Sequence, residues 1–342
     1  MCLEDILGLA QGSAQSRRRQ SLVAASLGMV TTQALGACVR LGICEALRDG
    51  PRAVDALALA MGARQEALAE LLAVLDTLGI VRLTRKGVRL SAKGRLLLAD
   101  HPGSVAQWVR YAAEFVAPAW MELADVVRGA PPTAHSRRRI YPALDRGRFP
   151  ARIFHAAMQD TQTEVATALA RAIRVKPREL VADLGAGQST FLVELLKRNP
   201  NATAVAIDKF SDFSVIQQKA EERGVASRLR VMAGDFLKPL RLTPDVIVLK
   251  NVLADWNDTS VRRILRLARK ALPAHGRLYI ATTHKHNPPT PEEAVVSLNL
   301  RVLTEGGDRH VSDYVELARE CHFALTRRTD IAAVAILEFE CR

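Results

Sequence analysis

Cysteine is scarce in this sequence, and its spacing excludes two common ways of stabilising a fold. The 342 residues include five cysteines, at positions 2, 38, 44, 321 and 341, with no C-x-x-C pair among them. A disulfide framework needs a denser set, and a structural zinc site needs ligands paired at short spacing. We therefore expect no disulfide framework, no bound metal and a cytoplasmic location.

Long apolar runs are also missing. No stretch approaches the eighteen uninterrupted apolar residues of a membrane-spanning helix. Residues 1–13, MCLEDILGLAQGS, carry acidic residues before any apolar run and have no basic start, unlike a secretion signal. The sequence contains no internal repeat. These absences predict a protein that is neither secreted nor inserted in a membrane.

Hydrophobic residues and positive charge are abundant. Hydrophobic residues make up 49% of the chain, which at this length is enough for one large and one smaller core. The formal net charge of +12 would help the protein to approach phosphates. However, lysine and arginine are spread along the whole chain, with tight clusters only at residues 17–19 and 137–139. This distribution does not favour nucleic acid as a partner.

The first hundred residues have the pattern of a winged-helix domain. Residues 15–100 are helical in pattern, with Leu71, Leu75 and Leu78 on one face of a helix. A short hairpin follows, because Val81 and Leu83 alternate with polar residues before a turn at residues 85–87, and the alternation then resumes. Helices followed by such a hairpin predict an all-helical domain with one β wing.

The most informative motif is VADLGAGQST, in the second half of the chain. An apolar run from Leu180 to Leu184 breaks at Gly185 and Gly187 and resumes at helical spacing, which predicts a strand, a tight loop and a helix. Glycine allows a ligand to lie against the loop and the amino end of the helix. The next apolar run ends at Asp208, where a carboxylate can accept both hydroxyls of a ribose.

Two details favour S-adenosylmethionine (SAM) over a dinucleotide as the ligand of this loop. Thr190 stands where a dinucleotide fingerprint has its third glycine. Asp183, at the strand end, suits a ligand with a positive sulfonium and ammonium but would repel a pyrophosphate. The third strand of the pattern ends in Asp235 and Phe236, an acceptor beside an aromatic ring, as an adenine requires.

With Lys250 at the end of the fourth strand, nearly the whole chain resembles the SAM-dependent O-methyltransferases of plant phenolic and bacterial polyketide and carotenoid pathways. The resemblance implies a Rossmann-like seven-stranded methyltransferase sheet with an N-terminal all-helical winged-helix dimerisation domain, and a homodimer formed through that domain. It also implies the cofactor site, made of Asp183, Gly185, Gly187, Asp208 at the ribose, Asp235 and Phe236 at the adenine, Lys250 at the methionine carboxylate, and Trp256 packing under the cofactor.

Three segments follow from this organisation. Residues 1–105 are the winged-helix dimerisation domain, residues 106–175 a helical connector lining the acceptor pocket, and residues 176–342 the SAM-binding catalytic domain. Within the connector, a helix over residues 151–172 resembles the family's pocket helix. It would present Phe154, His155 and Met158 to a small-molecule acceptor. The alternative is an ordinary helix with an apolar face.

A further helix is expected after the fifth strand, over the segment that begins NPPTPEEAVV. Its apolar positions would be Val295, Leu298 and Val302, and Asn299 would offer a polar group to the substrate. The tail, LTRRTDIAAVAILEFECR, reads as two terminal strands that complete the sheet.

The sequence departs from the family where the general base is expected. The family's usual His-Asp-Trp triplet reads Ala254, Asp255, Trp256 here. Of the two carboxylates that orient the histidine in the family, Thr282 replaces one, and Asp308 is a candidate for the other. A phenol with a pKa near ~10 is roughly three pH units from ionisation at neutral pH, a deficit of about 4 kcal/mol that a base normally relieves. Ala254 cannot relieve it.

Three routes remain open for catalysis. In the first, the acceptor is already acidic or is a carbon nucleophile. In the second, catalysis relies on holding the acceptor close to the methyl group, and in the third, another residue acts as the base. The candidates for a relocated base are His155, His310, and the pair His284 and His286. Asp255 is either catalytic or the N-cap of the next helix, a position that Asn257 or Asp258 could also fill.

The activity that best fits these residues is O- or C-methylation of an aromatic, polyketide-like or enolic acceptor in secondary metabolism. One alternative keeps the cofactor but uses its positive charge for a rearrangement, a hydroxylation or a cyclisation. Another alternative is a SAM-sensing regulator that uses the winged helix on DNA. The sequence names neither the acceptor nor the atom that is methylated.

Overall fold

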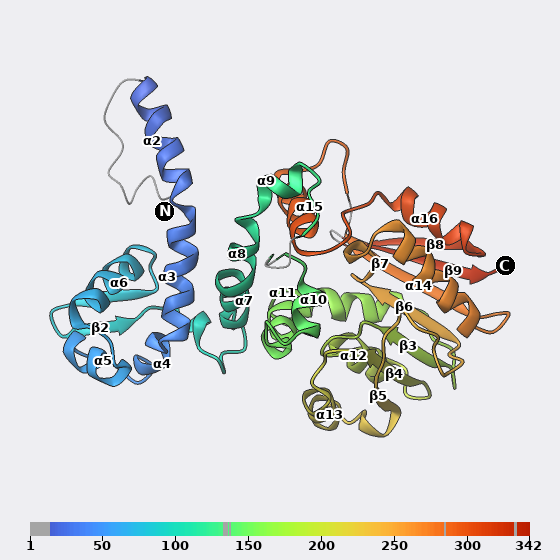
Figure 1. The fold of residues 1–342 in the computed structure, drawn as a ribbon. Helices are drawn as coiled ribbons and strands as arrows, with labels where there is room; N and C mark the ends of the chain where they lie inside the picture. The colour runs from blue at the N-terminus through green and yellow to red at the C-terminus, as the bar shows by residue number, and fades with distance from the viewer. Residues whose placement is uncertain (1–13, 133–135, 137, 284, 332–333) are drawn as a thin grey trace. The chain divides into compact units, whose positions relative to one another are not determined.

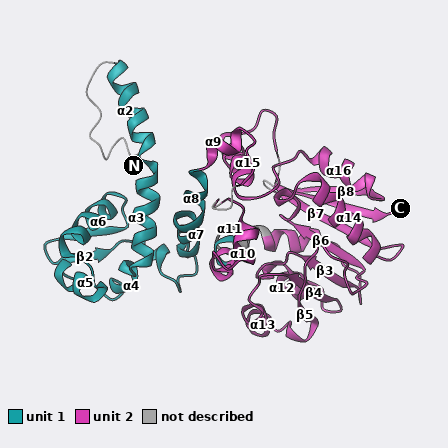
Figure 2. Ribbon diagram, in the orientation of Figure 1, with its two compact units in different colours: residues 1–121, 156–161 teal, residues 122–155, 162–342 magenta. Residues whose placement is uncertain are grey.

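The computed structural model describes residues 14–132, 136, 138–283, 285–331 and 334–342, and leaves the side chains of residues 159–165 undescribed. The chain forms two compact units, shown in different colours in Figure 2. The N-terminal unit holds the residues up to Met121 together with Ala156–Thr161. The C-terminal unit holds Glu122–His155 and Gln162–Arg342. The sequence had placed its boundaries at residues 105 and 175, and the division into three segments stays a prediction.

The N-terminal unit is helical with one β hairpin (Figure 1). Its elements are α2 (Ala14–Ser26), α3 (Gly28–Arg40), α4 (Ile43–Ala46), α5 (Val54–Met61), α6 (Gln65–Thr77), β1 (Val81–Thr84), β2 (Gly87–Leu90), η1 (Gly94–Leu97), α7 (Ala106–Tyr111), η2 (Ala112–Val116) and α8 (Ala117–Trp120). Strands β1 and β2 pair antiparallel, as the alternation predicted. Leu68, Leu72 and Leu75 of α6 are buried in the core of this unit.

Helices α2 and α3 carry exposed apolar side chains. Leu22, Val23, Met29 and Val30 are each exposed on them. Residues 14–40 are long and apolar enough to cross a membrane, with a mean hydropathy of 1.6 over an 18-residue window. This finding rests on length and composition alone, and the segment is interrupted at Leu27, which lies between the two helices. An exposed apolar helix pair also suits a protein partner.

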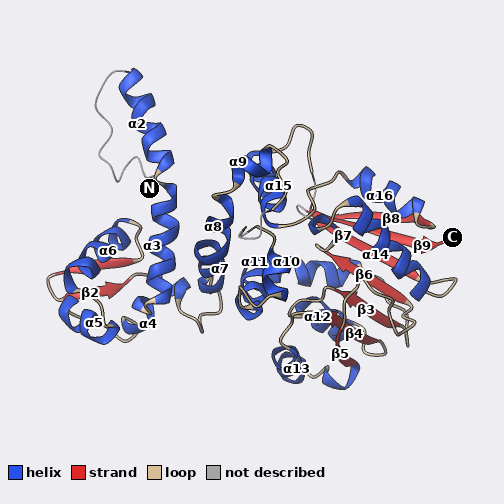
Figure 3. Ribbon diagram, viewed as in Figure 1, coloured by secondary structure: helices blue, strands red, loops and turns tan. Residues whose placement is uncertain are grey.

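The C-terminal unit is built on a seven-stranded sheet, as the sequence predicted (Figure 3). The strand order is β5-β4-β3-β6-β7-β9-β8. The strands are β3 (Leu180–Leu184), β4 (Thr203–Asp208), β5 (Leu229–Ala233), β6 (Val246–Lys250), β7 (Arg277–Thr283), β8 (Phe323–Ile331) and β9 (Val334–Cys341). The first five in the spatial order are parallel and β9 is antiparallel to both neighbours. The expected third strand ends at Ala233, so Asp235 and Phe236 lie in the following loop.

The helices of this unit bury the apolar residues of the sheet in two clusters. They are α9 (Leu123–Val127), α10 (Ile140–Asp145), α11 (Ala151–Ala172), α12 (Thr190–Arg198), α13 (Phe213–Glu222), η3 (Ala226–Arg228), η4 (Leu253–Asp255), α14 (Asp258–Ala271), α15 (Pro291–Leu303) and α16 (Val311–Glu320). Helix α11 has the bounds that the sequence predicted for the pocket helix, although its middle groups with the N-terminal unit.

Helix α15 differs from the expectation in the face that it buries. Val302 is fully buried, but Val295 is 60% exposed and Leu298 is only half-buried. The reason is that the buried residues of α15 are confined to its last turn, at Val302 and Leu303. The helix begins at a capping box formed by Thr290 and Glu293, so its amino end is fixed by capping rather than by packing.

Candidate active site

The polar residues predicted to bind the cofactor meet at one edge of the sheet. Strand β3 pairs in parallel with β4 and β6, so Asp183, Asp208 and Lys250 all lie at or near the carboxyl ends of adjacent strands. Ligands of open α/β sheets bind in the crevice at this edge, where the strand order reverses. Here the chain order reverses at β3, whose neighbours are β4 and β6.

The glycine loop after β3 has no room for side chains on its inner side. Gly185 has a φ of 77°, and a Cβ on it would lie 2.8 Å from Val252 Cγ2 and 3.4 Å from the ring of Phe236. Gly187 also has a positive φ, of 53°. The backbone can therefore approach a ligand closely, and Phe236 lies beside the loop as expected of an adenine contact.

Asp208 fixes the glycine loop as well as facing the site. Its carboxylate accepts hydrogen bonds from the backbone N–H groups of Gly187 at 3.0 Å, Phe210 at 2.8 Å and Ser211 at 3.0 Å. The Ser211 hydroxyl in turn donates to the carbonyl of Gly187 at 2.7 Å. Each carboxylate oxygen has capacity for about two hydrogen bonds, so Oδ2, which accepts one here, can still bind a ribose hydroxyl.

Asp183 and Lys250 form a buried pair of opposite charge. Burial raises the pKa of Asp183 to about 7, while the nearby Lys250 lowers it and Asp208 raises it. Burial likewise lowers the pKa of Lys250, and Asp183 raises it. The attraction between the two charges therefore offsets only part of the free-energy cost of burying each of them. A ligand that brings a cation to Asp183 and an anion to Lys250 would stabilise the charged forms of both.

Buried polar atoms without a partner surround the glycine loop, and they test whether SAM fits. Among the described residues, the carboxylate oxygens of Asp183, the hydroxyl of Ser189, the indole N–H of Trp256 and Nε2 of His155 are buried and lack a hydrogen bond. Buried polar groups in folded proteins are nearly always satisfied. A ligand with ammonium, carboxylate and hydroxyl groups would satisfy this set, so the residues present fit the cofactor.

An aromatic cluster lies next to the same edge. Trp256 meets Phe236 edge to face, with ring centroids 5.9 Å apart. Tyr141 of α10 stacks on Trp256 at 5.2 Å and on Phe210 at 6.4 Å, and it meets Phe154 edge to face at 6.3 Å. These rings supply the flat apolar surfaces on which an aromatic ligand packs.

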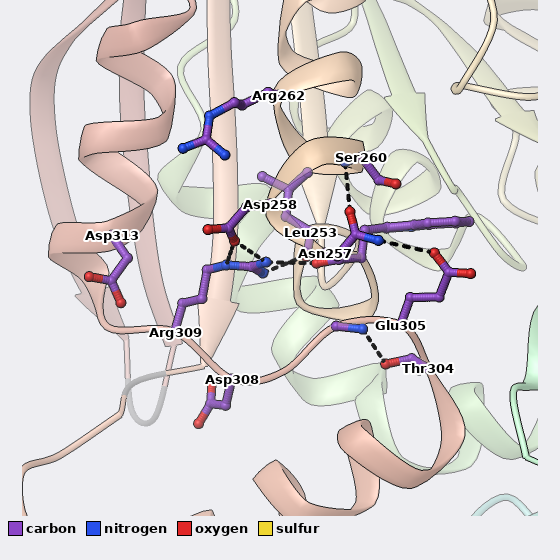
Figure 4. A network of polar contacts seen from close by, with 12 residues as sticks. Leu253, Asn257, Asp258, Ser260, Arg262, Thr304, Glu305, Asp308, Arg309 and Asp313 are labelled. Atoms are coloured by element: carbon purple, nitrogen blue, oxygen red, sulfur yellow. Dashed lines mark hydrogen bonds and ion pairs between the residues drawn. The ribbon is translucent and has the colours of Figure 1, made fainter. Parts of the chain in front are cut away.

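The loop that carries Ala254 is held by an arginine from the opposite segment (Figure 4). Arg309 donates to the carbonyls of Leu253 at 3.0 Å and Trp256 at 2.7 Å. Its guanidinium also contacts the Asp258 carboxylate at 2.7 Å. Three separate contacts from one planar group fix both ends of the 253–258 loop.

The segment before Arg309 completes this clamp. The backbone N–H groups of Glu305 and Gly307 donate to the carbonyls of Asp255 at 3.2 Å and Ala254 at 3.0 Å. Gly306 lies so close that a Cβ on it would be 2.6 Å from the backbone carbon of Asp255. Position 254 is therefore held by backbone contacts on both sides, and it carries only a methyl group where the sequence analysis expected the family's histidine.

Several sequence-predicted residues have other positions or roles. His155 is 7% exposed, and its Nε2 lies 3.7 Å from Asp208 Oδ1, next to the glycine loop. It therefore lies beside the carboxylate that is predicted to bind the cofactor, and its predicted role at the acceptor stays a prediction. Asn257 accepts from Ser260 N–H and caps α14, so Asp255 is not the cap.

Of the other candidate histidines, the structure describes His286 and His310, and each has a contact of its own. His284 lies outside the described residues. His286 is exposed, and its Nδ1 lies 2.5 Å from Glu293 Oε1. His310 precedes α16 as its N-cap, with Nδ1 3.2 Å from the carbonyl of Lys285. The roles of Met158 and Asn299, which are both half-buried, stay predictions.

Tyr141, Arg309 and Gly306 were not found by sequence reasoning. Tyr141 is 114 residues from its partner Asp255, and no local spacing marks such a pair. The dipeptide Gly306–Gly307 was visible, but a double glycine after a helix is also an ordinary C-terminal signal. Only the packing of residues 305–307 against the 253–258 loop shows that a side chain at Gly306 is excluded.

A sheet of this order, with a glycine loop after β3 and a carboxylate at the end of β4, is typical of α/β enzymes that bind a nucleoside cofactor. The chain belongs to the family described by the O-methyltransferase domain, whose model matches residues 120–324. It is a SAM-dependent methyltransferase, and S-adenosylmethionine is its cofactor.

Individual relatives cover most of the chain. Phenazine O-methyltransferase PhzM from Lysobacter antibioticus is 27% identical over 308 residues, which are 88% of this chain and 89% of the relative. Aclacinomycin 10-hydroxylase RdmB from Streptomyces purpurascens is 28% identical over 259 residues, covering 74% and 69%. The solved structure of mitomycin 7-O-methyltransferase MmcR matches with a TM-score of 0.87 and 26% identity, covering 96% of this chain and 99% of its own.

His155→Ala provides a test of the cofactor-side position of this residue. We expect the affinity for S-adenosylhomocysteine (SAH) to fall about tenfold, because the buried imidazole beside Asp208 would no longer contact the ligand. Calorimetric titration measures it. Unchanged SAH affinity combined with a large loss of turnover would instead support the role at the acceptor that the sequence predicted for His155.

Proposed function

We propose that this enzyme transfers the SAM methyl group to an acidic oxygen or an enol-like carbon of a small aromatic or polyketide-like acceptor in secondary metabolism. The observation that carries the proposal is the cofactor edge: Asp183, Asp208 and Lys250 lie together there beside the glycine loop. The match to a phenazine O-methyltransferase supports an aromatic acceptor. The aromatic rings around Tyr141 support the same class.

The cofactor residues have separate tasks in this proposal. Asp208 holds the ribose, Asp235 and Phe236 hold the adenine, and Lys250 binds the methionine carboxylate. Asp183, together with Gly185 and Gly187, receives the cationic part, and Trp256 packs beneath. The bound cofactor supplies an electrophilic methyl group, and the chain's own residues orient it and exclude water. Because Ala254 cannot accept a proton, the usual histidine base takes no part in the reaction.

We also propose a cytoplasmic homodimer, formed through the N-terminal unit. The exposed residues Leu22, Val23, Met29 and Val30 on α2 and α3 give that unit an apolar surface suited to a second copy. Sedimentation of the purified protein should give twice the mass of the 37.4 kDa chain. A monomer, or a protein that needs detergent to stay in solution, would contradict this assembly.

Two measurements test the proposed activity in sequence. Calorimetric titration with SAM and with SAH should give micromolar binding. Acidic phenols, carboxylates and enols are then incubated with SAM, and the expected product is heavier by one methyl group, with one SAH released per product. Absence of binding would remove the cofactor assignment, whereas binding without any transfer would remove only the acceptor class.

A second reaction class is favoured by a specific observation. The relative RdmB is named as a 10-hydroxylase, and this chain lacks the family's histidine at position 254. The SAM cation would then assist a hydroxylation, rearrangement or cyclisation without losing its methyl group. A converted acceptor with unchanged SAM and no SAH would establish this alternative over methyl transfer.

A further inference from the structure

The residue next to the missing base carries a hydrogen-bonded acid. Asp255 follows Ala254 directly, and its Oδ2 accepts a hydrogen bond from the Tyr141 hydroxyl at 2.5 Å. Tyr141 comes from α10, 114 positions earlier in the chain. The pair is therefore assembled by the tertiary structure at the place where the family's base is absent.

Both partners are held in position by contacts beyond their own bond. The ring of Tyr141 is packed among Trp256, Phe210 and Phe154. The backbone carbonyl of Asp255 accepts from the N–H of Glu305 at 3.2 Å. A fixed geometry of this kind is a requirement for proton transfer at a catalytic site.

Glu305 also ties the two segments together. Its carboxylate lies 3.0 Å from Arg139, just before α10, and accepts from the Asn257 side chain at 3.3 Å. The start of α10 and the 253–257 loop are thus bridged twice, through Glu305 and through the Tyr141–Asp255 bond. Because Asn257 is the N-cap of α14, Asp255 is not needed to cap this helix.

We propose that Tyr141 and Asp255 form a proton-accepting pair for a hydroxyl acceptor, with the Tyr141 oxygen facing the acceptor and Asp255 as the final proton acceptor. This role rests on the proposed methyl transfer. The acceptor O–H bond breaks and its proton passes to the Tyr141 oxygen, while Tyr141 passes its own proton to Asp255 Oδ2. The oxygen's electron pair forms the bond to the methyl carbon, and the carbon–sulfur bond breaks with its pair left on sulfur as a neutral thioether.

The electrostatic surroundings suit a base at neutral pH. Burial raises the pKa of Asp255 to about 6, and the hydrogen bond from Tyr141 lowers it. A base works best with a pKa near the working pH. The charged groups on the surrounding elements are Arg139, Glu305 and Arg309, with Lys209 beyond the ring of Phe210 and His155 beyond Phe154. Ionised Asp255 is the active form, so turnover should rise as pH increases through about 6 and fall below it.

Variants Tyr141→Phe and Asp255→Asn test the pair with two acceptors of different acidity. The probes are an unsubstituted naphthol, which is protonated in neutral solution, and the nitrophenol 2,4-dinitrophenol, which is ionised there. With naphthol we expect kcat to fall by about 100-fold or more in both variants, within the range that general bases supply. With nitrophenol, which needs no base, we expect less than about threefold change. The rise in kcat through pH 6 should disappear in Asp255→Asn.

Tyr279→Phe is the matched control. Tyr279 is a buried tyrosine that also donates to a carboxylate, Oε1 of Glu338, at 2.7 Å. The variant removes a bond of the same kind between β7 and β9, which are neighbouring strands of the sheet. It should lower stability without changing the ratio of the two kcat values or the pH profile.

SAH calorimetry separates the possible failures. Unchanged SAH affinity with the selective loss of naphthol turnover supports the pair. Equal losses with both acceptors, or a loss of SAH affinity that matches the loss of turnover, would overturn it in favour of a structural role. If wild-type protein binds SAH but methylates neither probe, the proposed transfer to phenols fails, and the proton-accepting role fails with it.

A measurement without turnover provides an independent check. Carboxyl ¹³C NMR, with the Asp255 signal assigned from its loss in Asp255→Asn, should show that this carboxyl titrates near pH 6 in the wild type. Because the Tyr141 hydroxyl stabilises the ionised form, the Asp255 pKa should rise in Tyr141→Phe. An unchanged pKa would show that the two groups do not interact in solution and would overturn the proposal.

Discussion

Replacing Asp208 by alanine is expected to weaken SAM binding by at least about tenfold, because the charge-assisted hydrogen bond from its Oδ2 to a ribose hydroxyl is lost. The structure adds a second reason for a large effect. The same carboxylate accepts three backbone N–H groups, from Gly187, Phe210 and Ser211. Its removal leaves these three N–H groups, including that of Gly187 in the glycine loop, without this partner. Calorimetric titration of the variant with SAM and SAH measures the loss.

Asp212→Ala is the control for this experiment. Asp212 lies four residues after Asp208 and caps α13 by accepting from Ser214 N–H at 3.1 Å. Its carboxylate is exposed, so its loss should slightly lower helix stability and leave cofactor affinity as it is. Equal SAM affinity in the wild type and Asp208→Ala would contradict the placement of the ribose at this strand end.

Gly306→Ala should disable the enzyme although it adds only a methyl group. The new Cβ would overlap the carbonyl oxygen of Ala254 and lie 2.6 Å from both Asp255 C and Trp256 N. These are backbone atoms, which cannot rotate out of the way. We expect a loss of stability of about 1–3 kcal/mol from overpacking and, because the 253–258 loop must shift, a fall in kcat/KM on the order of 100-fold.

The neighbouring glycine is a matched control in the same loop. A Cβ on Gly307 would meet Arg301 Cζ at 3.6 Å, which is an ordinary contact with a flexible side chain. Gly307→Ala should therefore keep near wild-type activity and a similar melting temperature. If both variants lose activity equally, the backbone freedom of glycine, and not close packing, explains why this loop contains glycine. If neither variant loses activity, the 253–258 loop and residues 305–307 are not in close contact in solution.

The sheet and its cofactor edge were predictable because their signals are local. Apolar runs of strand length, broken at Gly185 and ending at Asp208 and Lys250, predicted three strands whose carboxyl ends carry the polar residues. The two strands of the tail were predicted from the resemblance to the family, but their antiparallel pairing was not. In each case a pattern of a few consecutive residues determines both the element and the residue at its end.

Residues whose role depends on distant neighbours were not predictable in the same way. The sequence placed Val295 inside, but α15 buries only its last turn, so Val295 is exposed. The role of His155 at the acceptor stays a prediction, but its position beside Asp208 could not be foreseen from the sequence. The apolar face of a helix is buried along its whole length only when another element of the fold packs against all of it, and the sequence of the helix does not show this.

The sequence by itself determined which polar residues follow the strands at the carboxyl edge of the sheet, and that position 254 is an alanine. The tertiary structure alone decided that Tyr141 reaches Asp255, that Arg309 and Gly306 hold the 253–258 loop, and that His155 lies beside Asp208. The physical reason is range. Strands, turns and strand-end residues are set by hydrogen bonds and burial over a few positions, whereas these contacts join segments about 50 or more residues apart and exist only after both have packed.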